Sequence, residues 1–416
     1  MSMTTNNPQH DMEGAAASRP ASLWRNRDYL LLWGGQTFSS LGSSVSQLAF
    51  PLLILMLTGS PAQAGFAGAL RTLPYFILCL PAGALVDRWD RKRVMLICDS
   101  GRALSLLSVP IVLRLGHLTI LQLYLNALIE GTLVVFFSLA ESSCIPRVVS
   151  REQLPAATAQ GAVTEGFVQL LGPPLAGLLY SMGRTIPFVV DAVSYCASIV
   201  SLLLIKRDFQ EERVEQPLNL RAEIGEGLRW LWGQPALRSL ALLTSIVNFT
   251  FPDSSALIVI VIARQQHATP AFIGVIFSVG AVGYLVGSLV CGLCQRRFSV
   301  GRIIVTTCWL FALFWPLYAL ATNLFVLAGV TALIALVDPI YDITQFSYRA
   351  ARIPDALQGR VHSAYRLIAL ATPPLGLALT GLLLQRFGMV PTILVFAVAL
   401  LGLAVLATVN RHVRRA

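Results

Sequence analysis

Charged residues are scarce in this chain. Of its 416 residues, only 12% are lysine, arginine, aspartate or glutamate, whereas 55% are hydrophobic. A soluble globular protein has about 25% charged residues. This chain therefore has more apolar surface than an aqueous fold can bury. The composition excludes an ordinary soluble protein and predicts an all-α integral membrane protein.

Residue types that build chemical sites are also few or scattered. The seven cysteines are odd in number and show no disulfide spacing. Cys291 and Cys294 lie in an apolar segment without histidine or acidic neighbours, so we interpret them as packing residues. The sequence has no phosphate loop, nucleotide-binding motif, zinc signature or nucleophile elbow. We therefore expect no enzymatic activity, no cofactor and no metal, and an ion gradient as the energy source.

Long apolar segments fill most of the chain. A helix needs about 20 apolar residues to cross a bilayer. The sequence predicts twelve such spans, at residues 30–57, 64–86, 94–114, 119–141, 157–181, 186–205, 239–263, 270–294, 302–321, 323–346, 362–385 and 390–409. Residues 1–24 have no apolar run, which indicates a disordered tail and not a cleaved signal peptide.

The basic residues give the spans an orientation. The net charge of +10 could suggest a nucleic-acid partner, but the basic residues lie at helix ends, so we expect none. Cytoplasmic loops carry the excess of lysine and arginine. Only four arginines fall near the predicted outer ends: Arg114, Arg184, Arg264 and Arg386. Both termini are therefore expected in the cytoplasm.

The spans divide into two sets of six. Residues 83–93 align with 292–302, residues 144–146 with 352–354, and 173–175 with 373–375, at offsets of 209, 208 and 200 residues. Such a parallel repeat is typical of transporters that bind their substrate between two bundles. We expect a cytoplasmic tail, an N-terminal bundle, a cytoplasmic central loop, a C-terminal bundle and a basic cytoplasmic tail, at residues 1–24, 25–205, 206–237, 238–410 and 411–416.

One short charged loop, residues 83–93, lies between the second and third spans. It resembles the signature loop of the major facilitator superfamily, which implies two six-helix bundles and alternating access. The resemblance implies a gating motif of Gly83, Asp87, Arg88 and Arg91. Asp87 would contact the eleventh helix in one conformation, and the arginines would form ion pairs between the halves. Asp90 departs from the family pattern, where glycine is common. The alternative is a solvated turn.

Further segments resemble one particular family within this superfamily. Residues 26–39, 99–102, 145–154, 221–231 and 357–361 are similar to the third drug:proton antiporter family, which includes macrolide efflux proteins and the enterobactin exporter. The resemblance implies a multi-pass protein of the bacterial inner membrane that exports hydrophobic drugs or a siderophore. In the fifth span, Gly172, Pro173 and Gly177 match an exporter motif in part.

Ionisable residues inside the spans are candidates for function, because a charge in hydrocarbon costs at least about 2.5–3.5 kcal/mol. Asp99 and Arg102 lie three residues apart on one helical face and are a candidate ion pair. Glu130 and Glu165 are the leading candidates for a proton-coupling carboxylate that faces the cavity. The alternative for both is a hydrogen-bonded structural acid. The roles of the others stay open: Arg71, Asp191, Asp253, Asp338, Asp342 and Arg366.

These features together predict a proton-coupled exporter. The expected partners are a small lipophilic or amphipathic substrate, protons and lipid, and the protein is expected to be a monomer. Two alternatives remain. One is uptake or facilitated diffusion of a small nutrient, and the other is a non-transporting membrane receptor.

Overall fold

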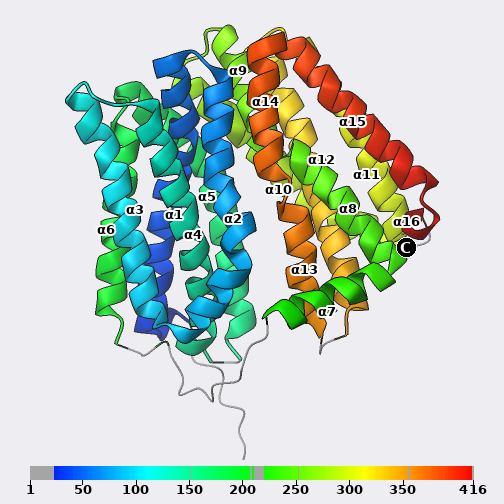
Figure 1. The fold of residues 1–416 in the computed structure, drawn as a ribbon, viewed down its shortest axis with the longest axis horizontal. Coiled ribbons are helices and arrows are strands. Elements are labelled where there is room, and N and C mark those ends of the chain that lie inside the picture. The colour runs from blue at the N-terminus through cyan, green and yellow to red at the C-terminus, as the bar shows by residue number, and fades with distance from the viewer. Residues whose placement is uncertain are drawn as a thin grey trace, which may run out of the picture.

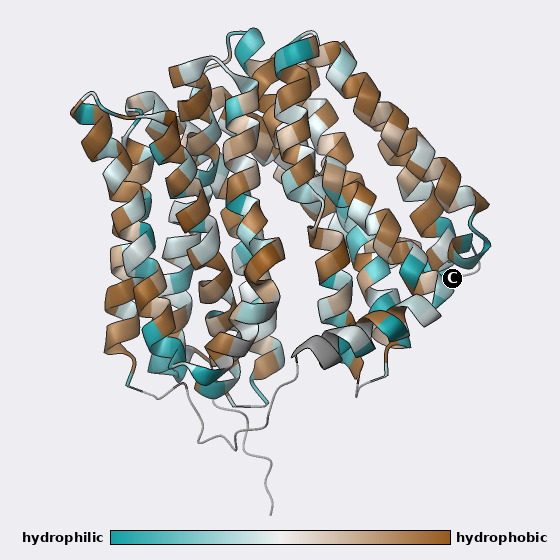
Figure 2. Cartoon of the chain, viewed as in Figure 1, coloured by the Kyte–Doolittle hydropathy of each residue, from teal (hydrophilic) through white to brown (hydrophobic). Residues whose placement is uncertain are grey.

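We analysed a computed structural model that describes residues 23–150, 152–206, 209, 220–251, 253–354 and 357–414. All regular structure within these ranges is helical. Two helical bundles lie side by side (Figure 1). Hydrophobic residues cover much of the outer helix faces, and hydrophilic residues gather near the helix ends (Figure 2).

The N-terminal bundle begins after the short 3-10 turn Leu23–Arg25. It consists of α1 (Arg27–Thr58), α2 (Pro61–Arg88), α3 (Arg91–Arg114), α4 (Ile120–Val148), α5 (Leu154–Met182) and α6 (Ile186–Leu204).

The helix α7 (Leu220–Gly233) precedes the C-terminal bundle. That bundle consists of α8 (Pro235–Thr250), α9 (Asp253–Gln265), α10 (Pro270–Arg297), α11 (Val300–Phe314) with the 3-10 turn η2 (Trp315–Leu320), α12 (Leu324–Arg352), α13 (Gln358–Leu370), α14 (Pro373–Phe387), α15 (Met389–Val409) and the short α16 (Arg411–Arg414).

Eleven helical segments among the described residues are long and apolar enough to cross a membrane. Eleven of the twelve predicted spans coincide with them. The remaining prediction, residues 64–86, coincides with the 28-residue helix α2, which is about 42 Å long. The boundary predicted between the ninth and tenth spans lies where expected, because the Asn323 side chain caps α12 by accepting the Val326 N–H at 2.9 Å. The count of twelve stays a prediction.

Two spans that the sequence predicts as continuous are interrupted. The seventh consists of α8 and α9, which meet near position 252, and the eleventh consists of α13 and α14, which meet at Ala371 and Thr372. Proline cannot donate the backbone hydrogen bond of a helix interior and clashes with the preceding turn. Pro373 therefore opens α14, and Pro252 lies outside the described residues.

The expected central loop, residues 206–237, contains a helix in its second part. Helix α7 occupies residues 220–233, and α8 already begins at Pro235. Helix α7 packs on α13, where Gly227 lies against the backbone of Arg360 and Glu226 pairs with Arg360 at 2.6 Å. Packing on the C-terminal bundle thus orders a segment whose composition alone indicates a loop. Of the predicted tails, residues 1–22 and 415–416 lie outside the described residues.

The two bundles meet through α2 with α14 and through α5 with α10. Glycines allow these close approaches: Gly65 and Gly381 face each other, and Gly177 lies against Pro270. We call the end where α2 and α10 begin the closed end. We call the opposite end, where α2 ends and α3 begins, the linker end. Figure 1 shows the ribbons of α2 and α13 diverging toward the linker end.

Candidate functional site

A cavity of about 1330 Å³ lies between the two bundles. Helices α1, α2, α4 and α5 line it from one side, and α8, α9, α10, α12, α13 and α14 line it from the other. Pockets that hold drug-sized ligands are about 300–1,000 Å³. The cavity is therefore large enough for one such molecule with space to spare.

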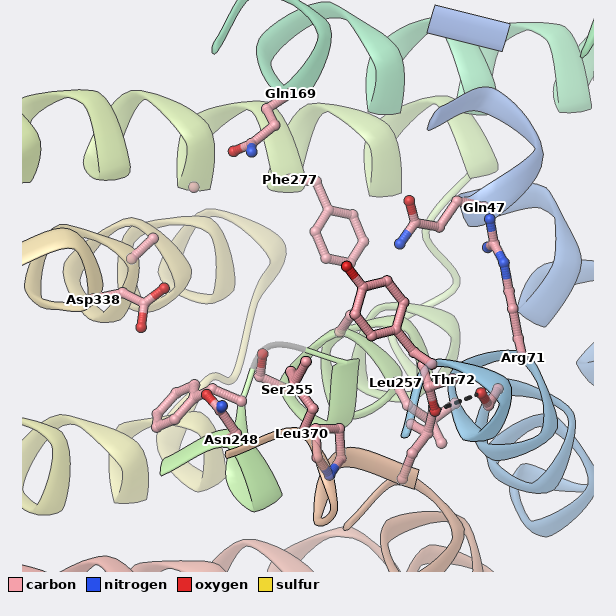
Figure 3. A pocket seen from close by; sticks show the side chains of 18 of the residues that line it. Gln47, Arg71, Thr72, Gln169, Asn248, Ser255, Leu257, Phe277, Asp338 and Leu370 are labelled. Atoms are coloured by element: carbon pink, nitrogen blue, oxygen red, sulfur yellow. Dashed lines mark hydrogen bonds between the residues drawn. The ribbon is translucent and has the colours of Figure 1, made fainter. Parts of the chain in front are cut away.

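Most of the cavity wall is apolar or aromatic. The aromatic residues on it come from both bundles: Phe50, Tyr75, Phe251, Phe277, Tyr284, Tyr318, Phe346 and Tyr365. A few polar side chains lie among them. In Figure 3, Gln47, Gln169, Asn248 and Ser255 surround the region occupied by Phe277. This combination offers a large apolar surface with scattered hydrogen-bonding groups.

Charged side chains of both signs line the cavity, and Arg349 and Arg366 do so from the C-terminal bundle. Asp338 and Asp342 of α12 line the cavity one helical turn apart, and Arg71 of α2 lines it from the other bundle. Figure 3 places Asp338 and Arg71 on opposite walls. The sequence left the roles of these residues open. The sequence signal for Asp338 and Asp342 is an acidic pair at a spacing of four within an apolar segment.

One polar contact joins the two bundles within the cavity. The Arg366 guanidinium of α13 donates a hydrogen bond to the Tyr75 hydroxyl of α2 and lies 5.3 Å from the centroid of the Tyr75 ring. From the sequence, Arg366 could have paired with an acid or extended to the membrane interface. In the structure its partner is a tyrosine of the other bundle.

A second charged site is buried inside the N-terminal bundle. Arg102 Nε donates to Glu130 Oε1 at 2.9 Å, and the Tyr195 hydroxyl donates to the same oxygen at 2.9 Å. The Arg102 guanidinium carbon also lies 4.2 Å from the centroid of the Tyr195 ring. Arg102 Nη1 lies 3.7 Å from Asp99 Oδ1. The structure thus brings the expected pair together, but it gives Arg102 a shorter bond to Glu130.

The two candidates for proton coupling lie in different surroundings. The expectation that Glu130 faces the cavity is wrong, since its side chain is 3% exposed and bonded to Arg102 and Tyr195. The next residue, Gly131, lines the cavity. Glu165 on α5 is exposed and acts electrostatically on Tyr284 of the cavity wall. A coupling role for either acid stays a prediction.

The signature loop is a tight turn in the structure. Helix α2 ends at Arg88, α3 begins at Arg91, and Asp90 caps α3 by accepting the Arg93 N–H at 3.1 Å. This cap gives a physical reason for aspartate where the family commonly has glycine.

The other members of the gating motif differ in burial. Arg88 is exposed, whereas Arg91 is buried and donates to the carbonyls of Ser143 at 3.1 Å and Phe209 at 3.4 Å. A Cβ at the half-buried Gly83 would meet only open space. The side chain of Asp87 lies outside the described residues. The gating role of the motif stays a prediction.

The glycines and the first proline of the partial exporter motif lie at close helix contacts. A Cβ at Gly172 would lie 2.0 Å from the Ser44 hydroxyl, and one at Gly177 would lie 2.2 Å from the Pro270 carbonyl of α10. The Pro173 carbonyl in turn faces Gly274 of α10. The motif therefore forms part of the contact between the two bundles.

Comparison with known proteins identifies the family. Residues 18–416 match the MFS_3 family, described as a transmembrane secretion effector. The chain belongs to this family. It is therefore a multi-pass membrane transporter of the major facilitator type.

Named relatives cover nearly the whole chain. The sequence is 27% identical to the multidrug efflux pump Tap of Mycolicibacterium fortuitum, over 91% of this chain and 94% of Tap. It is 24% identical to macrolide efflux protein A of Streptococcus pyogenes, over 94% of this chain and 98% of that protein.

A solved structure supports the fold. A bacterial homologue of the iron transporter ferroportin, in an inward-facing state, superimposes with a TM-score of 0.74. The two sequences are 18% identical, and the match covers 93% of this chain and 98% of the homologue. The major facilitator fold expected from the sequence is thus confirmed.

Proposed function

We propose that the protein exports lipophilic or amphipathic small molecules from the bacterial cytoplasm in exchange for protons, by alternating access. The observation that carries this proposal is the large, mostly apolar cavity between two bundles that meet at one end. The names of the relatives support export, since Tap is a multidrug efflux pump and the streptococcal protein is a macrolide efflux protein.

The linker end is the cytoplasmic end in this proposal. The cluster Arg88, Arg91, Lys92 and Arg93 lies there, at the turn between α2 and α3. Basic residues concentrate on the cytoplasmic side of membrane proteins. Both termini are then cytoplasmic, in the inner membrane of a bacterium. In this proposal the closed end faces outward, and the bundle contacts there separate the cavity from the outside.

The wall of the cavity supports an amphipathic substrate. Aromatic side chains such as Phe277 and Tyr284 offer apolar surface, and Asp338 and Asp342 offer negative charge opposite Arg71. A sugar would require a denser set of hydrogen-bonding groups. Because all these residues come from one chain, we expect the monomer to be the working unit. We also expect the substrate to be transported without chemical change.

A proton gradient is the energy source that we propose. Carboxyl groups in a low-dielectric site can bind and release protons. Glu130 and Glu165 remain candidates, and Asp338 and Asp342 on α12 are two further acids that do line the cavity. Substrate and proton would then occupy the protein in alternation, so that proton entry drives export.

Transport in cells tests the function. The protein is produced in bacteria that lack their main drug pumps, and accumulation of a labelled macrolide and of lipophilic dyes is measured with and without a protonophore. We expect lower accumulation that the protonophore abolishes. The matched control is Asp87→Asn, which is expected to insert normally and to export poorly. Unchanged accumulation across the panel would overturn the proposal, and increased accumulation would indicate uptake.

A further inference from the structure

The buried site around Arg102 contains more negative than positive groups. Three carboxyl groups, those of Asp99, Glu130 and Asp191, come from three helices and are each at most 3% exposed. Only Glu130 receives a charge-assisted bond from Arg102 at 2.9 Å. Burying an ionised carboxylate without compensating bonds is prohibitively costly, so such a group neutralises instead.

Two of the three acids lack the bonds that an ionised carboxylate needs. Among the described residues, neither Asp99 oxygen has a hydrogen-bond partner, and Asp191 Oδ2 has none. The other oxygen, Asp191 Oδ1, accepts from the Ser194 hydroxyl at 3.2 Å. Glu130 Oε2 also has no partner, but Glu130 differs because two donors, one of them the Arg102 guanidinium, converge on its Oε1. The geometry thus favours an ionised Glu130 and neutral Asp99 and Asp191.

The excess of acidic over basic groups remains when all charged and titratable neighbours of the site are counted. Helix α3 contributes Asp99, Arg102 and Cys98, α4 contributes Glu130 and Glu141, α6 contributes Asp191 and Tyr195, and α2 contributes Arg71. Helix α1 adds the hydroxyls of Ser43 and Ser46, and α6 adds the hydroxyl of Ser198 near Asp99. Four carboxyl groups therefore face two guanidinium groups. In the described part of the chain, no group of three or more acidic, histidine or cysteine side chains is arranged to hold a metal ion.

We propose that Asp99 and Asp191 carry protons in this state, and that the Arg102 cluster is the proton-binding site of the transporter. We define the Arg102 cluster as Asp99, Arg102, Glu130, Asp191 and Tyr195. This inference rests on the proposed proton-driven export and assigns its protons to a site separate from the substrate cavity. Arg102 lies within reach of Asp99 at 3.7 Å, so loss of the Asp99 proton would draw the guanidinium from Glu130 toward Asp99.

One further acid, Glu141, lies beside the cluster at a depth similar to that of Asp99. Glu141 lies seven residues before the end of α4, about 10 Å along the helix, and its charge interacts with Asp99. Asp99 lies about 12 Å from the start of α3 at the same end. Because its charge interacts with Asp99, Glu141 is the carboxyl group that we expect to pass protons between the cluster and the linker side.

Two helices connect the cluster with the cavity. On α1, Ser43 accepts a bond from Arg102 at 3.2 Å, while the next residue, Ser44, lines the cavity. On α4, Glu130 belongs to the cluster, while Gly131 lines the cavity. A change of partner by Arg102 therefore acts on helices that also form the substrate site.

Infrared spectroscopy of the purified full-length protein tests the proton site without a substrate. We expect a carbonyl band of protonated carboxylic acid at neutral pH that shifts in deuterium oxide. Asp99→Asn and Asp191→Asn should each remove part of it. The matched control is Glu226→Gln, because Glu226 is exposed and pairs with Arg360, so its loss should leave the band unchanged.

A wild-type spectrum without such a band at neutral pH would overturn the proposal even if the asparagine variants failed to fold. A band that folded variants leave intact would overturn it as well. Transport gives an independent readout in vesicles with a labelled macrolide. Both variants should retain exchange without a gradient and lose accumulation driven by a pH gradient. If wild-type protein moves no macrolide, the proposed export is wrong for this solute, while the infrared result still decides the proton site.

Discussion

The two halves of the protein place their ionisable groups differently. In the N-terminal bundle, Arg102 and Glu130 are buried between helices and pair with each other. In the C-terminal bundle, Asp338 and Asp342 lie on the wall of the cavity. The N-terminal bundle places Arg71 on the cavity wall, but its Arg102–Glu130 pair lies behind that wall, whereas Asp338 and Asp342 face the cavity. Similar bundles can therefore serve different parts of one transport cycle.

The two halves also differ in how the backbone accommodates a pair of prolines, in the fifth span and in the eleventh. Helix α5 continues through Pro173 and Pro174, whereas the eleventh span breaks before Pro373. At the break, α8 supplies replacement bonds: Ser245 donates to the Ile368 carbonyl at 3.0 Å, and Asn248 donates to that of Ala369 at 2.9 Å. Carbonyls freed by proline need partners. The eleventh span can therefore be interrupted because side chains of α8 bond the carbonyls that the interruption leaves free.

The largest predicted effect is a difference in stability between a variant of the buried Arg102–Glu130 pair and a variant of the cavity wall. Glu130→Gln leaves the buried Arg102 without its ionised partner, which should destabilise the protein by about 3–5 kcal/mol. Asp338→Asn on the cavity wall should change stability by only about 0.5 kcal/mol. Thermal unfolding of the purified proteins in detergent measures the difference. Equal losses in the two variants would contradict the distinction between the halves.

A second substitution tests the contact between the halves. A Cβ at Gly274 would lie 2.2 Å from the Pro173 carbonyl, so Gly274→Ala should cost about 1–3 kcal/mol in the state described here. The closed end should then open more often. Labelling of a cysteine introduced at Ala271 with a membrane-impermeant reagent measures this opening. Gly292→Ala, on the same helix but facing open space, is the control and should label like the parent.

A third substitution addresses the broken helix. Asn248→Leu removes the donor to the Ala369 carbonyl, at a cost of about 1–3 kcal/mol if that carbonyl stays unsatisfied. Hydrogen exchange should speed up in α13 near Leu370 and stay unchanged in α5 near Pro173. Faster exchange in both segments would mean that the substitution acts on the whole fold and not on the break.

The smallest effect should come from the polar link between the bundles. Tyr75→Phe removes the hydroxyl that accepts from Arg366 but keeps the ring beneath the guanidinium. The loss should be about 0.5–1.5 kcal/mol, because water in the cavity can replace the bond. Transport rates should therefore change by about tenfold at most. A complete loss of transport would assign Tyr75 a direct role in substrate binding.

Much of the fold follows from the sequence because each span is a local property. Length and apolar composition locate the membrane segments, and Asn323 marks the boundary of α12 through a local cap. The spacing of Asp99 and Arg102 places them on one helical face. The interpretation of Glu130 as a cavity residue failed, since helical depth says how far a residue lies from the ends but not which neighbour it faces.

The sequence by itself determined where the eleven apolar helical segments of the described chain lie and that Asp99 and Arg102 share one helical face, because hydrophobicity and helical period act over short distances. Only the tertiary structure decided which groups pair with the ionisable side chains. Glu130 receives bonds from Arg102 and Tyr195, which are 28 and 65 residues away in the chain. Ionised side chains in a low-dielectric interior require partners, and the packing of α3, α4 and α6 selects which ones are within reach.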